Sequence, residues 1–587
     1  MRLMEIKKAL REISTELLPP LNVSILRNVT VEAIEPYHRY LAARMGANAQ
    51  LKFGGYDAVW QEAVFGANDL LSGSTDCVVV LTYFDNLSPA LARNFADMSA
   101  EAVEAEVARV EGFCREVLEG IRRHTQAMVL WHGWELPCHP SFGVADNLLP
   151  GGQWATLMRL NQFMRELLAS IRNAYFINTT ACLMRLGWDR YFDLRHWHIA
   201  RAPYTGEALA EFAGEHYKYM RAVKGKNKKC LVLDCDNTLW GGIIGEDGIS
   251  GIAIGPGSTG SAYADFQREA LGLYHRGVIL ALCSKNNEAD VLEVLHTHPD
   301  MVLREEHLAT WQVNWDDKVI NLARIAEDIN IGLDSLVFMD DSELEINLVR
   351  QMLPQVEAVH LPLGRASEYA HTLASCGFFD TLTISDEDHH RGGMYRAEAN
   401  RKRVRRGEAD LDSYLGSLGM VLTVRRTDQI TLPRVAQLTQ RTNQFNLTTR
   451  RYTEEDIAWL IAEGNEVLCL RVVDQFGDSG IVGACILKIS SDTASFDTFL
   501  MSCRVLGRRI ETAFLVKALE VAKARGCCRA LGKYVPTAKN TQVAGFFSEH
   551  GFAMEREEAD GSGSFVLDIS KGLPDIPEIF KEILFDV

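Results

Sequence analysis

The stretch Val232-Leu-Asp-Cys-Asp-Asn-Thr-Leu-Trp-Gly241 carries most of the information in this sequence. A short apolar strand runs directly into two carboxylates, Asp234 and Asp236, and Thr238 follows them. Side chains alternate along a strand, so residues two apart share a side. Two converging carboxylates repel each other unless a cation or a phosphoryl group lies between them. The stretch therefore predicts phosphoryl transfer, in which one carboxylate attacks phosphorus, the other moves a proton and a divalent cation screens both.

Three further segments supply polar groups in a consistent order. A buried apolar strand is predicted to end at Ser284, whose hydroxyl can donate to a phosphate oxygen. An apolar-periodic helix is predicted to hold Lys318 in its first turn, as a fixed cation. Another strand delivers Asp340 and Asp341. Because the carboxyl ends of parallel strands meet at one edge of a sheet, we expect these groups to converge there.

This order resembles the haloacid dehalogenase-like (HAD) phosphotransferase superfamily. The resemblance implies that Asp234 is the nucleophile, which forms an aspartyl-phosphate, and that Asp236 is the general acid/base. It also implies a set of phosphate-binding residues, namely Thr238, Ser284, Lys285 and Lys318. The implied magnesium ligands are Asp234, Asp236 through its main-chain carbonyl, Asp340 and Asp341. Mg²⁺ suits the site independently, because it is a hard cation that prefers carboxylate and phosphate oxygens.

The spacing of these motifs leaves no room for a lid domain. The interval from Asp234 to Ser284, and that from Ser284 to Lys318, each hold only a turn, a helix and a strand. The glycine-rich residues 243–260 can form a small flap at most. An uncovered site admits a bulky partner but excludes water poorly. We therefore expect a macromolecule or a long tethered arm to cover the site during the reaction.

Composition indicates a multi-domain cytoplasmic enzyme. The chain has 587 residues, too many for one core, and 47% of them are hydrophobic. Its net charge of −17 argues against nucleic-acid binding. No apolar run is long enough to span a membrane, and residues 1–20 lack a signal-peptide core. The 13 cysteines are scattered, as is typical of reduced, buried thiols, and none has the spacing of a zinc site.

Residues 1–222 alternate helices and strands, which predicts a doubly wound α/β domain. The expected helices cover 31–45, 99–123 and 155–173, and the expected strands cover 23–27, 76–81 and 127–131. The region resembles a degenerate SGNH-hydrolase fold, since Asp193-Leu-Arg-His196 matches the Asp-x-x-His element of that fold. No Gly-Asp-Ser nucleophile follows the first strand, and we expect Thr30 to cap the next helix instead. The domain is expected to act as a scaffold or binding module.

The charged residues 385–415 separate the predicted catalytic domain, 223–384, from the last domain. They include an acidic run at 386–388 and the basic run Arg401-Lys-Arg-Val-Arg-Arg406. A solvated helical linker is the ordinary interpretation of such a stretch. Docking of an acidic partner is the other, because a negatively charged protein needs a local basic patch to attract one.

Residues 416–587 predict an α+β domain that resembles the GNAT acetyltransferase fold. A meander of strands leads through Arg504-Val-Leu-Gly-Arg-Arg509 into a helix over 509–524. In that fold the amides of the turn and the helix N-terminus bind a pyrophosphate. The resemblance implies that a pantetheine or CoA-like group binds at Arg504, Gly507, Arg508 and Asn540. The turn contains one glycine, so we expect the phosphopantetheine arm of a carrier protein rather than acetyl-CoA.

The chain as a whole resembles FkbH-like proteins, which form HAD subclass IIIC. The matching strings lie at 234–242, 283–286, 440–447, 474–478, 502–507 and 536–540. The sequence departs from the family at Asp340-Asp-Ser-Glu343, where Asp-Asp-Asn-Pro is usual, and at Cys235, where leucine is usual. The fold expected from these resemblances is α/β and multi-domain. Its centre is a Rossmannoid HAD domain without a large cap, flanked by the SGNH-like and GNAT-like domains.

The resemblance implies a glyceryl transfer that serves polyketide-type biosynthesis. Such proteins dephosphorylate 1,3-bisphosphoglycerate and load its glyceryl unit onto the phosphopantetheine thiol of an acyl carrier protein. Cys283 is the candidate acyl acceptor, with a pKa lowered by magnesium and Lys318. In a regular strand Cys283 and Ser284 face opposite sides, so both reach one pocket only if the strand breaks. A plain phosphatase acting on a phosphorylated macromolecule or sugar, and a non-catalytic scaffold, are the alternatives.

Overall fold

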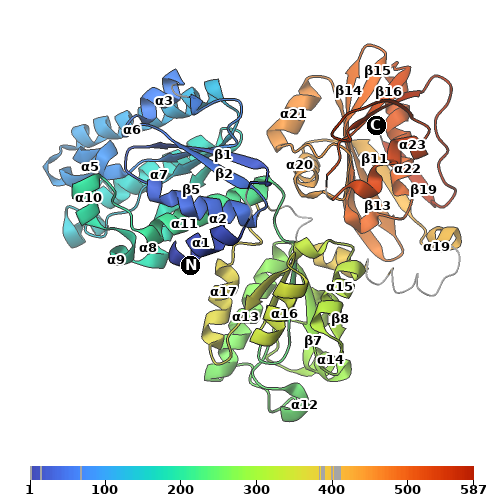
Figure 1. Cartoon of the computed structure of the whole chain (residues 1–587), viewed down its shortest axis with the longest axis horizontal. Helices are drawn as coiled ribbons and strands as arrows, with labels where there is room; N and C mark the ends of the chain where they lie inside the picture. Colours follow the sequence, from blue (N-terminus) through green and yellow to red (C-terminus); the bar gives the residue numbers. More distant parts are fainter. Residues whose placement is uncertain are drawn as a thin grey trace. The chain divides into compact units, whose positions relative to one another are not determined.

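The computed structural model describes residues 3–13, 16–66, 69–382, 384, 391–397, 401, 411–537 and 539–586. The chain divides into two compact units, Met1–Arg221 and Ala222–Val587 (Figure 1). Three sheets organise it, one in the first unit and two in the second. The chain is therefore a mixed α/β protein of several domains. Every helix in the described part of the chain is too short or too polar to cross a membrane.

The first unit is built on a parallel sheet of five strands in the order β2-β1-β3-β4-β5. The strands are β1 (Pro20–Arg27), β2 (Asn48–Phe53), β3 (Cys77–Leu81), β4 (Met128–His132) and β5 (Ala174–Ile177). All five residues of β3 are buried, as expected for a parallel sheet that is covered on both faces. The predicted doubly wound arrangement is present.

Helices cover the two faces of this sheet in different ways. On one face, Val129 and Trp131 of β4 share a hydrophobic cluster with α6 (Ala100–His124) and α7 (Gln153–Ala169). On the other face, three buried histidines join the sheet to α2 (Glu35–Arg44) and α11 (Gly206–Val223). The Nε2 atom of His132 lies 2.6 Å from His216 Nε2, and His216 Nδ1 lies 3.0 Å from His38 Nε2. Burial lowers the pKa of His38 and of His132 to about 3, so both rings are neutral.

The predicted cap at Thr30 is wrong. A 3-10 turn, η1 (Glu32–Ile34), precedes α2, and Val31 occupies its N-cap position without a side-chain bond. The Thr30 hydroxyl instead donates to Ala200 O at 2.7 Å, and its amide donates to Arg201 O at 2.8 Å. A contact with residues so distant in the sequence outweighs the local capping preference, which sequence alone does not reveal.

The second unit begins with a parallel sheet in the order β10-β9-β6-β7-β8. Its strands are β6 (Cys230–Leu233), β7 (Ile279–Ser284), β8 (Leu308–Val313), β9 (Leu336–Asp340) and β10 (Glu357–His360). The strands are parallel, and β6 pairs with β7 on one side and β9 on the other. The order in which successive strands are added to the sheet therefore switches sides at β6. Ligand sites of parallel α/β sheets lie at the carboxyl ends of the strands at such a switch point. The 232–241 stretch enters the structure there.

Only a small flap follows β6. It contains the single-turn helix α12 (Ile244–Asp247), at the foot of Figure 1, and is tied back by antiparallel bridging between Gly241 and Ala253. A side chain at Gly241 would place its Cβ 2.8 Å from the Tyr263 ring, so only glycine fits there. The next helix, α13 (Ser258–His275), already belongs to the layer that covers the sheet. The expectation of a flap rather than a lid domain is met.

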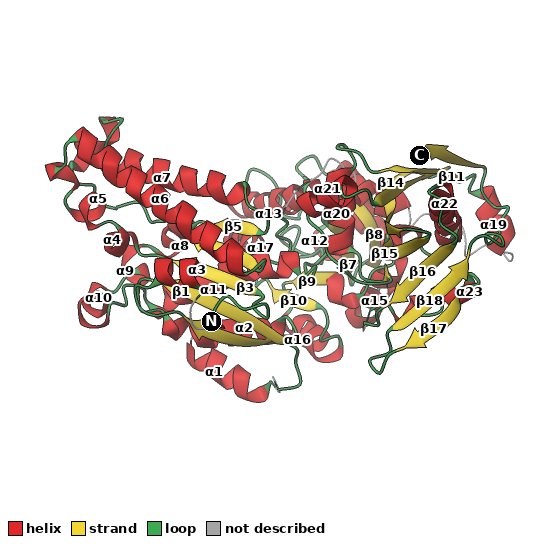
Figure 2. Cartoon of the chain, turned by 90° about the horizontal axis from the view of Figure 1, so that it is seen from above, coloured by secondary structure: helices red, strands yellow, loops and turns green. Residues whose placement is uncertain are grey.

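The last sheet mixes parallel and antiparallel pairs in the order β17-β18-β16-β15-β14-β13-β11-β19. The strands are β11 (Val421–Arg426), β13 (Glu466–Asp474), β14 (Gly477–Ser490), β15 (Thr493–Met501), β16 (Arg529–Tyr534), β17 (Ala553–Glu557), β18 (Gly563–Asp568) and β19 (Glu582–Asp586). β16, β18 and β17 lie side by side, as Figure 2 shows. The predicted helix is present as α22 (Ile510–Ala524).

One pair in this sheet separates along its length. β15 and β16 are parallel and pair only over their first residues, Thr493 to Ser495 against Arg529 to Leu531. At the far end of β15, the short strand β12 (Phe445–Asn446) pairs with it instead. Asn540 Nδ2 donates to Asn446 O at 2.9 Å, and Val535 N donates to Leu447 O at 2.8 Å. Residues 445–447 thus bond to both sides of the splayed pair.

Residues 385–390 and 402–410 lie outside the described residues, and with them the acidic run at 386–388 and all of the basic run at 401–406 except Arg401. Arg401 is described, and it is buried rather than solvated. Its guanidinium donates to Asp474 Oδ1 at 2.8 Å, and Arg508 donates to the other oxygen, Asp474 Oδ2, at 3.1 Å. For Arg401, both interpretations from the sequence are wrong, because the side chain is part of the core of the last domain.

We predict that Asp474→Asn lowers the free energy of unfolding by about 3–5 kcal/mol, because it removes the buried carboxylate that the guanidinium groups of Arg401 and Arg508 both contact. Urea unfolding monitored by circular dichroism measures the change. The matched control is Asp478→Asn, which removes an exposed ion pair with Arg471 and should cost less than about 1 kcal/mol. Equal losses for the two variants would contradict the interpretation.

Candidate functional site

The carboxyl edge of the parallel β10-β9-β6-β7-β8 sheet gathers the predicted catalytic groups. Asp234 follows β6, Ser284 ends β7 and Asp340 ends β9. Lys318 is the first residue of α15 (Lys318–Asp328), which follows β8. All four side chains are buried. The parallel strand order thus brings together residues that are far apart in the sequence.

Lys318 bridges two of the carboxylates. Its Nζ lies 2.7 Å from Asp234 Oδ1 and 2.6 Å from Asp340 Oδ2, and all three side chains are at least nine-tenths buried. Burial alone would lower the pKa of Lys318, but the two carboxylates outweigh burial and raise it. The ammonium is therefore a permanent cation at the centre of the edge.

Three carboxylates lie close enough together to hold a metal ion. One oxygen from each of Asp234, Asp340 and Asp341 lies within 4.8 Å of the others. Burial and the charge of Asp234 raise the pKa of Asp340 to about 7 and that of Asp341 to about 6. Three carboxylates and one ammonium leave two negative charges, which one divalent cation would neutralise. The donor set suits Mg²⁺, which binds carboxylate oxygens.

Asp236 is held apart from this group by hydrogen bonds to both of its oxygens. Its Oδ1 accepts from Trp240 Nε1 at 2.9 Å and from Ile244 N at 3.0 Å, and its Oδ2 accepts from Asn286 Nδ2 at 2.8 Å. Burial raises the pKa of Asp236 despite these bonds. The side chain is not among the three grouped carboxylates. It is a fixed carboxyl with a raised pKa, which suits proton transfer.

The sequence did not point to Asn286 or Trp240 as partners of Asp236. Both lie within conspicuous strings, 234–242 and 283–286, but nothing in the spacing shows that one carboxylate joins them. The turn that follows Asp236 depends on Asn237, whose φ of +53° is unusual for a non-glycine residue. Asn237 Oδ1 accepts from Gly242 N at 3.0 Å, which holds the turn closed. Asparagine tolerates this conformation better than most residues.

The predicted phosphate-binding residues do not all meet. Ser284 and Thr238 are buried, and the Thr238 hydroxyl has no hydrogen-bond partner. Lys285 is directed elsewhere. Its Nζ bonds Glu345 at 2.8 Å and lies 3.6 Å from Asp317, and the bond to Glu345 raises its pKa. Lys318 is therefore the cation at the carboxylate edge.

The expectation of a reactive Cys283 is wrong. β7 is regular: Leu280 and Leu282 face one hydrophobic cluster, whereas Ala281 and Cys283 face another. Cys283 is 0% exposed, and burial raises the pKa of its thiol although Lys318 acts in the opposite direction. A buried thiol of this kind is inert. Ser284 alone reaches the catalytic edge from the end of this strand.

In the first unit, Asp193 and His196 form no catalytic pair. Asp193 caps α10 (Leu194–Ala200) and pairs with Arg195 at 2.9 Å. The ring of His196 lies 3.7 Å from Asp193, and 64% of its side chain is exposed. Asp193 is thus a helix-capping residue, and His196 lies at the surface.

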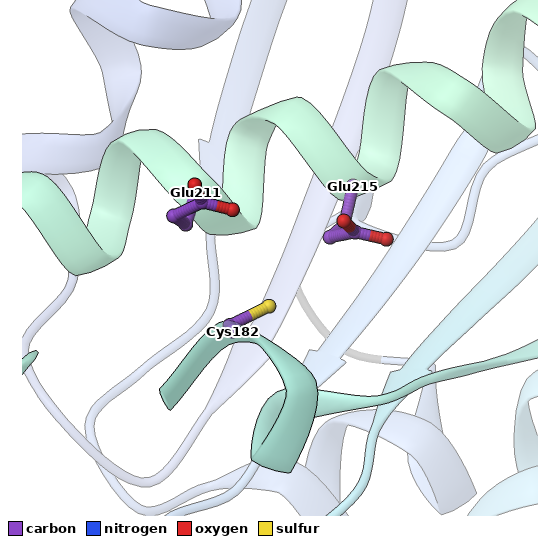
Figure 3. Close-up of side chains that lie close together, drawn as sticks. All are labelled: Cys182, Glu211 and Glu215. Atoms are coloured by element: carbon purple, nitrogen blue, oxygen red, sulfur yellow. The ribbon is translucent and has the colours of Figure 1, made fainter. Parts of the chain in front are cut away.

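A second group of possible metal ligands also lies in the first unit. Glu211 and Glu215 project from one side of α11 toward Cys182 of α8 (Thr179–Leu186), as Figure 3 shows. Arg185 occupies this group. Its Nη2 atom lies 3.0 Å from Glu211, 2.7 Å from Glu215 and 3.4 Å from Cys182 Sγ. The carboxylates already have their cation, so the group is an ion-pair cluster.

The residues expected to bind pantetheine are largely committed to internal contacts. Arg508 pairs with Asp474, and Asn540 bonds to backbone carbonyls on both sides of the splayed strands. Arg504 is 3% exposed and lies over the Tyr395 ring. Gly507 has a φ of +76° in the turn before α22. The side chains of Arg508 and Asn540 are thus structural, contrary to their expected role.

No protein-family model and no curated protein matches the chain. Among solved structures, the N-terminal part of BF1531 from Bacteroides fragilis is similar. It contains a phosphatase domain and was crystallised with Mg. The match has 26% identity and a TM-score of 0.59, and it covers 65% of this chain and 100% of that chain. The ribosomal-protein-S18-alanine N-acetyltransferase from Escherichia coli matches 25% of this chain and 90% of its own, with 14% identity and a TM-score of 0.20.

We predict that Mg²⁺ affinity falls about tenfold between about pH 8 and about pH 6. Mg²⁺ binds deprotonated carboxylates, and protons compete for Asp340 and Asp341 as the pH falls through their raised pKa values of about 7 and about 6. Isothermal titration calorimetry measures the affinity.

The substitution Asp341→Asn should weaken Mg²⁺ binding by about tenfold or more at the higher pH. The control Glu215→Gln alters the ion-pair cluster of the first unit and should leave the affinity unchanged. Mg²⁺ binding that depends on Glu215 and not on Asp341 would place the metal in the first unit and contradict the site at Asp234, Asp340 and Asp341.

Proposed function

We propose that this protein is a magnesium-dependent phosphotransferase of the HAD type. One observation carries the proposal: the buried Lys318 ammonium lies between Asp234 and Asp340, with Asp341 beside them. Burying unbalanced charge is costly, so a scaffold with a vestigial site would be expected to lose these groups. The likeness to a phosphatase domain crystallised with Mg supports the same function.

Each residue has a definite part in the proposed reaction. An oxygen of Asp234 attacks phosphorus, and an aspartyl-phosphate forms as the bond to the leaving oxygen breaks. Asp236 gives a proton to that oxygen and then takes one from the water that hydrolyses the intermediate. Lys318 neutralises phosphate oxygens. Bound Mg²⁺ would screen the carboxylates and phosphate from one another and orient the transferring group.

The substrate we propose is 1,3-bisphosphoglycerate, and the acceptor is the phosphopantetheine thiol of an acyl carrier protein. The FkbH-like strings throughout the chain support this choice. The small flap supports it too, since a carrier protein can itself cover an open site. The 13 free cysteines support a cytoplasmic setting, where thiols stay reduced.

The proposed transfer has two parts. The pantetheine thiolate attacks the acyl carbon, so that a C–S bond forms as the bond from that carbon to the phosphate oxygen breaks, and inorganic phosphate leaves. Asp234 then takes the phosphoryl group of the remaining phosphate ester, Asp236 protonates the released alkoxide, and water hydrolyses the aspartyl-phosphate to a second inorganic phosphate. Because Cys283 is buried, we assign the attack to the carrier thiol itself, with no acyl-enzyme at Cys283.

A plain phosphatase is the second candidate. The internal contacts of Arg508 and Asn540 favour it, because they withdraw two side chains from the expected arm-binding site. It predicts release of phosphate from 1,3-bisphosphoglycerate or other phosphate esters without any change in a carrier protein.

We predict that Asp234→Asn lowers magnesium-dependent phosphate release by at least about 10³-fold, because the variant lacks the nucleophile. A colorimetric phosphate assay with a generic aryl phosphate measures the loss. The control Asp265→Asn alters an exposed pair on α13 and should retain full activity. Undiminished phosphate release by Asp234→Asn would exclude the proposed chemistry.

We further predict that a phosphopantetheinylated carrier protein gains the mass of one glyceryl group when incubated with the chain, Mg²⁺ and 1,3-bisphosphoglycerate. Intact-protein mass spectrometry detects the product, and Asp234→Asn should not form it. The variant Cys283→Ala should form it at the wild-type rate, because that thiol is buried. Phosphate release with an unmodified carrier would support the plain phosphatase instead.

A further inference from the structure

A small cavity in the second unit has a strongly cationic lining. Its volume is ≈ 60 Å³, and it lies at the amino ends of β6 and β7. Five of its described lining residues carry positive charge, namely Lys229, Arg391, Arg434, Arg441 and Arg504. None of the described lining residues is Asp or Glu. The chain as a whole carries a net charge of −17, so five cationic residues around one cavity contrast with the overall negative charge of the protein.

Arg504 brings a buried donor without an acceptor to this cavity. The residue is 97% buried, since 3% of its surface is exposed. Its Nε donates to Ser502 Oγ at 3.2 Å, and its Nη1 contacts the sulfur of Met394. Its Nη2 is buried and has no hydrogen-bond partner. A buried donor on a charged group without a partner is strongly unfavourable, so an anionic acceptor here would be stabilising.

Lys229 adds a second ammonium from the residue that precedes β6. Burial lowers its pKa, and the neighbouring cations of Lys539 and Arg391 act in the same direction, while Cys503 and Asp334 oppose them. Lys539 is itself paired with Asp334. Burial is thus the main cause of the lowered pKa of Lys229, and a bound anion would stabilise its charged form.

A neighbouring cavity of ≈ 50 Å³ repeats the pattern. It shares Lys229, Arg391 and Arg441 with the first cavity and adds Lys228 and Arg276. Its described lining residues also include no Asp or Glu. The first cavity has room for roughly four waters, which is the number of oxygens in a phosphate group.

We propose that the cavity lined by Lys229 and Arg504 binds a phosphoryl group. The ligand is either inorganic phosphate or the phosphodiester of a pantetheine arm, and only the second source rests on the proposed function. The guanidinium of Arg504 supplies donors whose geometry matches phosphate oxygens. Lys229 supplies a compact ammonium charge.

This site is distinct from the catalytic edge. Lys229 precedes β6 and Asp234 follows it, so the two lie at opposite ends of one extended strand, ~16 Å apart. A phosphate bound near Lys229 is therefore not the phosphoryl group that Asp234 attacks. Arg504 belongs to the string that suggested pantetheine binding, but the structure places it in this cavity rather than at the start of α22.

Calorimetric titration of the full chain with inorganic phosphate, in the presence of EDTA, tests the proposal. Without metal, the carboxylates of the catalytic edge repel phosphate, so the titration reports the second site. We expect saturable binding that Arg504→Gln and Lys229→Gln each weaken by about tenfold or more. The control Lys571→Gln removes a charge whose side chain is 82% exposed and should bind like the wild type.

Absence of saturable binding in the wild type would overturn the proposal, and so would unchanged affinity in Lys229→Gln. Lys229 borders the cavity and makes no catalytic contact, so this variant tests the site even if Arg504→Gln fails to fold. A second titration with phosphopantetheine separates the two sources. Binding about tenfold tighter than that of phosphate assigns the site to the arm, and equal binding assigns it to free phosphate. Because no turnover is involved, a failure of the proposed function leaves this result intact.

Discussion

The ammonium of Lys318 between Asp234 and Asp340 is the interaction on which the catalytic edge depends. Without it, three carboxylates would crowd one buried corner of the sheet, and their repulsion would oppose folding. Its charge does not fully balance theirs, and the raised pKa values of Asp340 and Asp341 express the remainder. The carboxylate edge therefore keeps a net negative charge that favours binding of a divalent cation.

The sheet topology explains why these groups meet and why Asp236 behaves differently. β6 lies at the switch point, so Asp234 has the ends of β7 and β9 on either side. Asp236 leaves the strand into a turn held by Asn237, where Trp240 and Asn286 fix its carboxyl away from Lys318. Two carboxylates that are neighbours in sequence thus acquire separate environments, one for attack on phosphorus and one for proton transfer.

Local patterns were sufficient to predict three strands of the central sheet, β6, β7 and β9, and the positions of Ser284, Lys318 and Asp340 at its edge. Apolar runs, helix periodicity and the rule for parallel sheets are all readable from the sequence. The errors came from tertiary contacts. Burial outweighs Lys318 at Cys283, and Arg401 pairs with Asp474 across 73 residues of sequence. The partners of Asp236 were missed for the same reason, since Asn286 reaches it from the loop after β7.

Trapping of the covalent intermediate is the sharpest test of nucleophilic attack by Asp234 beside Lys318. The chain is mixed with substrate and Mg²⁺, quenched within one turnover, digested and examined by peptide mass spectrometry. We expect one phosphoryl group on the peptide that carries Asp234, and none when Lys318 is replaced by methionine. A phosphoryl group on any other residue, or rapid turnover with no phosphorylated peptide, would show that Asp234 is not the nucleophile.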